Sequence, residues 1–315
     1  MASPGLPAVS LRQLEYVVAV AERGSFRHAA QACHVAQPSL SAQVALVEQA
    51  LGVRLFDRDR RGVRVTAAGE AVVAQARQVL LAAGDLRTVA QQFTDPFRGT
   101  LRVGVIPTIG PYLLPFIVPA LTKAYPKLTL HWSEERTAVL VERLHDGALD
   151  AAVVALEADI GSCEYAVLGR DAFVLAGAPA HPLMKSRRPA TAADLDEAPL
   201  LLLNDGHCFR DQVLHLCAEA HARIRSMSFE ATSLSTLVQM ASAGTGATLL
   251  PSLALPVENR RGQLRVRRFA PPVPGRTLIL AWRRGSALRP ALSHLAGTMR
   301  KAYPKTRAAS PRGMW

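Results

Sequence analysis

The chain has 315 residues, 49% of them hydrophobic, and a formal net charge of +12 at pH 7. This length accommodates two or three domains with cores of their own, and this composition excludes a disordered chain. No apolar run approaches the length of a membrane-spanning helix, and the first residues lack the basic and apolar regions of a signal peptide, so we expect a cytoplasmic protein that does not contact a membrane.

The basic excess lies at the C-terminal end of the chain. Residues 260–315 contain 14 Lys or Arg and no Asp or Glu, which leaves residues 1–259 with a net charge of −2. A basic tail usually forms a solvated surface and only sometimes contacts a polyanion. The overall charge therefore does not by itself predict nucleic-acid binding, and the residues after Arg300 receive no functional assignment.

Residues 1–65 predict a winged helix-turn-helix domain. Apolar residues recur at helical spacing after Leu11, Ser25 is placed to cap a short second helix, and Gln37 opens a third helix. In such a motif the later helix enters the major groove of double-stranded DNA by its N-terminal end. The residues at that end, together with arginines of the hairpin that follows, are the candidates for contact with bases or phosphates: Gln37, Pro38, Ser39, Ser41, Gln43, Arg58 and Arg61.

Residues 66–93 predict one long amphipathic helix with an apolar stripe from Val72 to Leu86. Two interpretations of the stripe are open: packing on the helix-turn-helix domain, or a dimer seam that would place two recognition helices one turn of DNA apart. We favour the dimer seam. Residues 94–99 interrupt the helical pattern with Pro96 and Gly99 and predict a hinge.

From residue 100 onward, short apolar segments alternate with helical ones. The expected strands are Leu101–Ile106, Leu128–Trp132, Ala151–Leu156, Ala172–Ala176 and Leu200–Leu203, and the expected helices include Ala138–Ala148 and Leu234–Ala243. This alternation predicts an α/β domain with largely parallel sheets.

The segment from Gly206 to Cys217 carries two cysteines. A thiol is a nucleophile only as a thiolate, which positive charge and a helix N-terminus favour, and His207 and Arg210 flank Cys208. On one continuous α-helix Cys208 and Cys217 would point to opposite sides and lie about 13 Å apart along the axis, at ~1.5 Å per residue. A disulfide needs Cα atoms within roughly 7 Å, so the pair can form only if the segment rearranges. The two thiols are either a redox switch or buried and unreactive.

The other cysteines, Cys33 and Cys163, are interpreted as bystanders. The four cysteines include no C-x₂-C pair, and the histidines show no metal-ligand spacing. We therefore expect free thiols, no metal site and no cofactor.

Nearly the whole chain resembles the LysR-type transcriptional regulators. The signature comprises Ala29-Ala30, Gln37-Pro38-Ser39-Leu40-Ser41, the run from Leu51-Gly52-Val53 to Phe56-Asp57-Arg58, and Thr66-Ala67-Ala68-Gly69. Within that family, Ile106–Pro115 and Gly206–Gln212 with Cys217 are similar to the members that sense peroxide. Most other members of the family lack this cysteine pair.

The resemblance implies a bacterial transcription activator, a homodimer or homotetramer that binds promoter DNA and RNA polymerase and that hydrogen peroxide oxidises. It implies that Cys208 is the peroxidatic cysteine, that Cys217 resolves its sulfenic acid as a disulfide, and that a thiol reductase resets the pair. Support of the peroxide site is assigned to His207, Arg210, Asp211, Thr108 and Thr137. For the threonines a plain helix N-cap remains an equal alternative, and Asp211 is expected to steady Arg210 or Gln212 rather than take part in chemistry.

The resemblance further implies a regulatory domain of two subdomains that resemble periplasmic binding proteins. Residues 100–170 with 276–315 would form the first and residues 171–275 the second, with the chain crossing near 171 and 275. Three alternatives remain: a regulator that binds an organic effector between the subdomains without thiol chemistry, a thiol peroxidase, and a regulator whose sensing has decayed. Because an enzyme has no use for a DNA-binding module, we expect a protein that is not an enzyme.

Overall fold

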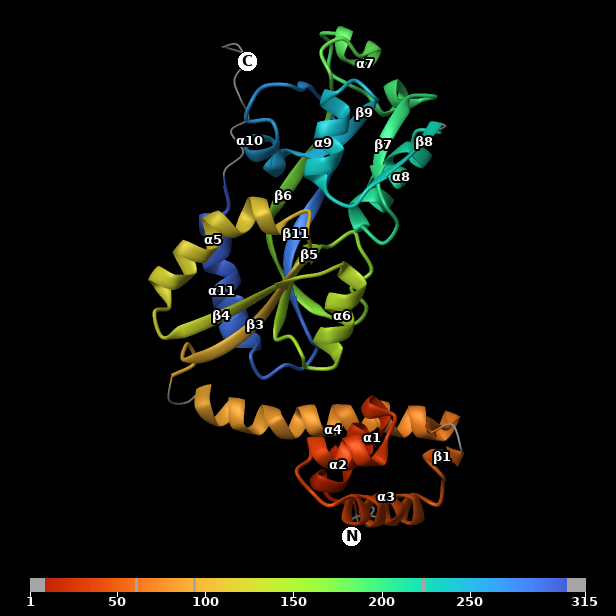
Figure 1. Ribbon diagram of the computed structural model, residues 1–315. Helices are drawn as coiled ribbons and strands as arrows, with labels where there is room; N and C mark the ends of the chain where they lie inside the picture. Colours follow the sequence, from red (N-terminus) through yellow and green to blue (C-terminus); the bar gives the residue numbers. More distant parts are fainter. Residues whose placement is uncertain (1–8, 60–61, 93–94, 222–224, 305–315) are drawn as a thin grey trace. The chain divides into compact units, whose positions relative to one another are not determined.

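The computed structural model describes residues 9–59, 62–92, 95–221 and 225–304. The chain forms two compact units, residues 1–93 and 94–315. The N-terminal unit consists of helices and one small hairpin, whereas the C-terminal unit is α/β (Figure 1). Within the described residues no helix is both long and apolar enough to span a membrane.

The N-terminal unit is the expected winged helix-turn-helix. Its elements are α1 (Leu11–Arg23), α2 (Phe26–Ala32), α3 (Gln37–Leu51), and a wing in which β1 (Phe56–Asp59) pairs antiparallel with β2 (Gly62–Val65). The hydroxyls of Ser10 and Ser25 cap α1 and α2, and Gly24 and Gly52, both with positive φ, end α1 and α3. The motif therefore follows from its capping residues as well as from its apolar pattern.

The apolar stripe of the long helix α4 (Ala67–Gln92) is buried at one end and exposed at the other. Val73 and Ala76, in its first turns, are buried, and this helix packs on α1. Further along, Val79 is 39% exposed and Leu86 is 72% exposed. The first part of the stripe thus belongs to the core of its own unit, whereas the later part is uncovered.

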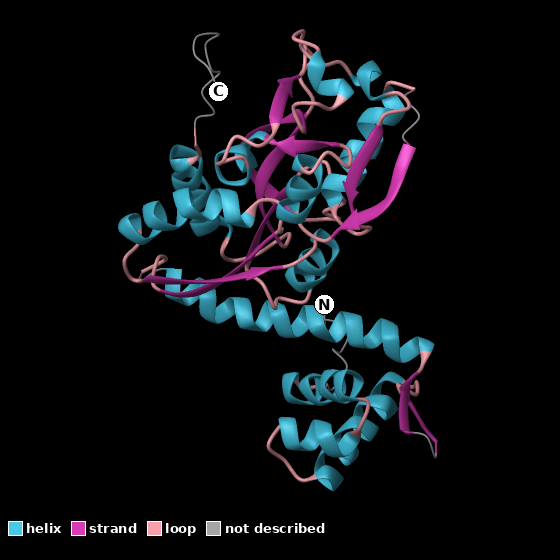
Figure 2. Ribbon diagram, turned by 45° about the horizontal axis from the view of Figure 1, so that its top comes forward, coloured by secondary structure: helices cyan, strands magenta, loops and turns pink. Residues whose placement is uncertain are grey.

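The C-terminal unit contains most of the helices and strands. In chain order they are β3 (Gly99–Val105), α5 (Gly110–Ala124), β4 (Leu128–Glu134), α6 (Thr137–His145), β5 (Ala151–Ala155), β6 (Glu164–Gly177), α7 (Pro182–Lys185), β7 (Pro199–Leu203), α8 (Cys208–Glu219), β8 (Arg225–Ala231), α9 (Leu234–Ser242), β9 (Ala247–Pro251), α10 (Leu255–Glu258), β10 (Arg265–Arg268), β11 (Gly275–Trp282) and α11 (Arg289–Ala302). The strands form the centre of the unit and the helices surround them (Figure 2).

The expectation of largely parallel sheets is wrong, because the sheet is mixed. The strand order is β4-β3-β5-β11-β6-β9-β7-β8, with β10 also beside β6. In the first half β3 runs parallel to β4 and β5, and in the second half β7 runs parallel to β8 and β9. Every pairing made by β6 and β11 is antiparallel. These two strands join the two parallel halves.

The strand β6 is much longer than the expected segment Ala172–Ala176. It pairs with β11 as far as Ala172, and from Phe173 onward it pairs with β9. The polar residues Arg170 and Asp171 lie inside this strand, where a sequence pattern predicts a break. Asp171 is fully buried nevertheless, because it is paired with the equally buried Arg276 of β11.

Candidate functional site

The two cysteines of interest lie on one uninterrupted helix. Cys208 is the first residue of α8 and Cys217 lies near its end, and both are free thiols. Gly206, with a φ of 85°, makes the turn that leads from β7 into α8. At ~1.5 Å per residue the two cysteines stand about 13 Å apart along the axis, so a disulfide between them requires α8 to unwind.

A small pocket lies directly against Cys208. It has about 10 Å³ of space for the centre of a water-sized molecule, which is room for roughly one such molecule. Three segments form its wall: the loop after β3, the start of α6 and the turn into α8. The lining residues are Ile106, Pro107, Thr108, Arg136, Thr137, Gly206, His207 and Cys208. A wider groove of about 690 Å³ adjoins it, and Thr137, Gly206 and Cys208 line both.

Arg276 holds Thr108 in this wall. Its Nη1 donates to Thr108 Oγ1 at 2.7 Å and its Nη2 to the Thr108 carbonyl at 2.8 Å. Nε and Nη2 also donate to Asp171 Oδ2, at 3.2 and 3.1 Å. Because the Thr108 oxygen accepts from a guanidinium, its own proton is left to donate into the pocket.

The same arginine contacts the helix that carries the thiol. The Arg276 guanidinium carbon lies 5.5 Å from the ring centroid of Phe209, which follows Cys208 in α8. That ring packs edge-on against Phe173 of β6, with 5.1 Å between the ring centroids. Arg276 thus links both crossover strands, the Thr108 loop and the start of α8.

Neither threonine is a helix cap. The N-cap positions of α5 and α6 belong to Ile109 and Arg136, and neither helix has a side-chain cap hydrogen bond. Thr137 is 7% exposed, lines the Cys208 pocket and bonds no other side chain of the described chain through its hydroxyl. Both hydroxyls are therefore available to a molecule in the pocket.

The surroundings of Cys208 act on the pKa of its thiol in opposite directions. Burial raises its pKa, the neighbouring Thr137 hydroxyl and the charge of Arg276 lower it, and the negative charge of Asp211 raises it again. Burial is the largest of these effects, so the pKa lies above its usual value. The cation that lowers this pKa is Arg276, which is distant from Cys208 in the sequence, and not the neighbouring Arg210.

The two basic residues that flank Cys208 in the sequence have other roles. The Arg210 guanidinium pairs with Asp205 at 2.9 Å and Glu230 at 3.4 Å, and it donates to the Leu203 carbonyl. His207 is 6% exposed and lines the pocket, and burial followed by the charge of Arg136 lowers its pKa. His207 therefore brings a neutral imidazole to the pocket rather than a cation.

The remaining predicted residues lie farther from the reactive position. Asp211 is exposed and lines the wider groove. Cys217 is 1% exposed and does not line the pocket, and burial raises its pKa to about 11. Cys163 is buried and Cys33 is half-buried, and neither lines the pocket.

The predicted DNA-binding residues lie on α3 and the wing. Gln37, Pro38 and Ser39 are exposed at the start of α3, whereas Ser41 and Gln43 are half-buried. Arg58 lies in β1, and Arg61 is outside the described residues. A polar, accessible helix N-terminus is what a helix-turn-helix inserts into the major groove.

Sequence reasoning missed Arg276 and Asp171 as site residues. Both are fully buried, whereas charged residues are normally expected at the surface. A weak signal exists, because Asp171 and Arg276 stand at the two positions where the chain was expected to cross between subdomains.

Two family models match the chain. A model of the lysR family of bacterial regulatory helix-turn-helix proteins matches residues 11–70, and a model of the LysR substrate binding domain matches residues 94–304. A hydrogen peroxide-inducible genes activator from Dickeya chrysanthemi is 42% identical over 93% of this chain and 95% of that protein. A probable hydrogen peroxide-inducible genes activator from Mycobacterium avium is 41% identical over 90% of this chain and 91% of that protein.

Solved structures of OxyR are similar over almost the same length. A full-length cysteine-to-aspartate variant of OxyR from Pseudomonas aeruginosa has a TM-score of 0.74 and 35% identity, and covers 95% of this chain and 99% of that chain. A cysteine-to-serine mutant of OxyR from Corynebacterium glutamicum, with hydrogen peroxide bound, has a TM-score of 0.64 and 33% identity, and covers 95% of this chain and 94% of that chain.

Proposed function

The chain belongs to the LysR family of bacterial helix-turn-helix regulators, and on that premise we propose that it is a peroxide-sensing transcription activator switched by a reversible Cys208–Cys217 disulfide. The observation that carries the proposal is the water-sized pocket against Cys208, with the hydroxyls of Thr108 and Thr137 in its wall. Peroxide-inducible activators that share about two fifths of their residues with this chain support it.

In the oxidation step the Cys208 sulfur attacks one oxygen of hydrogen peroxide and the O–O bond breaks. The sulfur is oxidised to a sulfenic acid, and the second oxygen leaves and becomes water with the proton of the former thiol. Thr108 and Thr137 donate hydrogen bonds to the peroxide oxygens. The Arg276 charge stabilises the negative charge that develops on sulfur and on the leaving oxygen. The neutral imidazole of His207 can carry the proton between them.

In the resolution step the Cys217 thiol attacks the sulfenic sulfur, the disulfide forms and water leaves. Because α8 keeps the two sulfurs apart, residues 205–218 unwind before the bond can close. Phe209, Val213 and Cys217 are each at most 2% exposed, so this unwinding removes three side chains from the core. Rebuilding that core is the conformational signal, and a thiol reductase returns the pair to two thiols.

The signal reaches DNA through the assembly of the regulator. The uncovered part of the α4 stripe, with Val79 and Leu86, is proposed as the dimer seam. A dimer places two α3 helices on successive major grooves, and a homotetramer of two such dimers changes its DNA and RNA polymerase contacts when the regulatory units refold.

The deciding experiment is mass mapping of the thiols after one equivalent of hydrogen peroxide is added to the fully reduced protein. The expected product is a rapid Cys208–Cys217 linkage. Cys217→Ser should stop at a sulfenic acid on Cys208, Cys208→Ser should leave Cys217 reduced, and the control Cys163→Ser should form the linkage normally.

The opposite outcome would assign the protein to another class of regulator. If Cys208 and Cys217 both stayed reduced while excess oxidant attacked thiols at random, peroxide sensing would be abandoned. The groove of about 690 Å³ has the size of a small-ligand site, so an organic effector bound there would become the proposed signal.

A further inference from the structure

Three residues of the N-terminal unit form a chain of hydrogen bonds from the main chain to the recognition helix. The Ser10 backbone N–H donates to Gln13 Oε1 at 2.8 Å, and the Ser10 hydroxyl lies 3.2 Å from the same oxygen. The Gln13 N–H returns a bond to Ser10 Oγ at 3.3 Å, which completes a capping box at the start of α1. Gln13 Nε2 then donates to Gln43 Oε1 of α3 at 2.9 Å.

This chain determines the orientation of two side-chain amides. A backbone N–H can only donate, so the end of the Gln13 amide that faces Ser10 must be the oxygen. The NH₂ end of Gln13 therefore faces α3, and the group that meets it on Gln43 must be an acceptor. The Gln43 oxygen thus faces Gln13, and no other described residue bonds the Gln43 side chain.

The position of Gln43 makes this orientation relevant to DNA. It lies two turns into α3 and is half-buried, beside the exposed Ser39 and Ala42. A glutamine with both ends free pairs with adenine in the major groove through one acceptor and one donor. In this chain Gln13 holds the oxygen end of Gln43, so the NH₂ end is the one left to donate to an acceptor on DNA.

We propose that Gln43 contacts DNA as a hydrogen-bond donor through its NH₂ group, and that Gln13 is the positioning residue that turns this group away from α1. The inference rests on the DNA binding assigned to this regulator. Its ligand is a hydrogen-bond acceptor on the duplex: guanine O6 or N7, thymine O4, adenine N7, or a phosphate oxygen.

The substitution Gln13→Glu reverses the orientation of the Gln43 amide. Glu at the third helical position is the usual partner in a capping box, so Gln13→Glu keeps the bond from Ser10 and the start of α1. A carboxylate has no proton to give, so Gln43 must turn its NH₂ toward residue 13 and present its oxygen to DNA. Gln49→Glu is the matched control, because it adds the same charge to an exposed position near the end of α3.

The test uses the full-length oxidised protein and a pool of randomised duplex DNA, followed by affinities for the selected site and its single-base variants at one salt concentration. Gln13→Glu should lose about tenfold or more in affinity for the wild-type site, beyond the loss of Gln49→Glu. At one base pair its preference should move from an acceptor edge to a donor edge, cytosine N4 or adenine N6. If the partner is a phosphate, the loss should be equal for all sequences and no preference should move.

Two results would overturn the inference. Wild-type selection with Gln13→Glu indistinguishable from Gln49→Glu would reject the role of Gln13 and leave DNA binding intact. A wild-type protein that enriched no sequence would reject the assigned DNA binding and this inference together. As a further check, Gln43→Leu should lose affinity without acquiring a new preference.

Discussion

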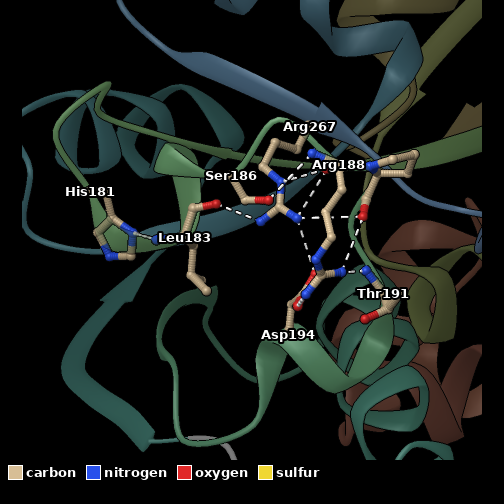
Figure 3. Close-up of polar contacts among 8 residues, drawn as sticks. His181, Leu183, Ser186, Arg188, Thr191, Asp194 and Arg267 are labelled. Carbon is tan, nitrogen blue, oxygen red and sulfur yellow. Dashed lines mark hydrogen bonds and ion pairs between the residues drawn. The ribbon is translucent and has the colours of Figure 1, made fainter.

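Arg267 and Arg276 are both buried and both paired with an aspartate, yet their remaining hydrogen bonds go to very different groups. Arg267 of β10 is 6% exposed and contacts Asp194 at 3.1 Å. It also donates to the main-chain carbonyls of Leu183 and Arg188, at 2.6 and 3.2 Å. Figure 3 shows Arg188 and Arg267 meeting at Asp194, with the segment around them folded over the two guanidinium groups.

Arg276, in contrast, bonds to residues that come together only in the folded unit. Thr108 lies after β3, Asp171 lies on β6, and Phe209 lies in α8 beside the reactive cysteine. The Arg267 cluster therefore holds one loop against a strand, whereas the Arg276 cluster connects the chemistry to both halves of the sheet. The partners of a buried arginine, and not its burial, indicate whether its loss affects stability or reactivity.

The largest effect is expected where both charges of the Arg276 pair are removed. Asp171→Asn with Arg276→Gln leaves no unpaired buried charge, so the unit should fold. The variant loses the cation that lowers the pKa of Cys208 and the anchor of Thr108, so the rate of Cys208 oxidation by peroxide should fall about 100-fold. Stopped-flow measurement of that rate, with thermal unfolding as the control for folding, checks the prediction. An unchanged rate would mean that Arg276, like Arg267, contributes to stability and not to the reactivity of Cys208.

At the second arginine, Arg267→Met should lower stability without changing reactivity. The substitution leaves Asp194 without its buried cation and part-buried carbonyls of the 183–189 segment without donors, and we expect the free energy of unfolding to fall by about 2 kcal/mol. Urea denaturation measures this loss, and the same peroxide assay should return the wild-type rate. A slower reaction with peroxide would show that the Arg267 cluster acts on the distant thiol.

The two threonines of the Cys208 pocket should have similar effects on reactivity and different effects on stability. Thr108→Val and Thr137→Val should each slow Cys208 oxidation by about tenfold, because each removes one donor to the peroxide oxygens. Their effects on stability should differ. Thr108→Val leaves Arg276 Nη1 without its acceptor and should cost about 1 kcal/mol, whereas Thr137→Val removes a hydroxyl with no other partner and should cost less. Equal losses of stability would contradict this assignment.

The smallest effect concerns Cys217, the proposed resolving cysteine, whose pKa is raised by burial. Its pKa of about 11 lies above the ordinary value of 9.0, so the folded state binds the thiol proton more tightly than the unfolded state. This contribution to stability is complete below pH 9 and is lost as the pH rises toward 11. The difference in unfolding free energy between the wild type and Cys217→Ser should therefore shrink over that interval. A difference independent of pH would show that burial does not raise the pKa of Cys217.

The N-terminal unit was largely predictable because its determinants are local. Ser10, Ser25, Gly24 and Gly52 act within a few residues of their helix ends, and the apolar spacing follows from the helical period. Five strands of the regulatory unit were located for the same reason, whereas β8, β9, β10 and β11 were not predicted. The strand directions were not predicted either, because β6 and β11 pair across long separations that no local pattern records.

The redox site was predictable only in part for a related reason. Cys208, Cys217 and the two threonines stand in recognisable segments. The cation near the sulfur does not, because Arg210 is adjacent in sequence but pairs with Asp205, whereas Arg276 is 68 residues away in the chain and adjacent in space. A buried Asp–Arg pair cannot be recognised in a single sequence, because each of the two residues alone is expected at the surface.

The unbroken helix α8 also sets a thermodynamic property of the switch. The packing of α8 is present while the cysteines are thiols, and the proposed disulfide would form only after α8 unwinds. Stabilising the dithiol in this way raises the reduction potential, by about 30 mV for each 1.4 kcal/mol. Good packing of Phe209, Val213 and Cys217 therefore makes the disulfide a stronger oxidant and easier to reset. Substitutions in the core beneath α8 should tune how long the proposed oxidised state persists in the presence of a thiol reductant.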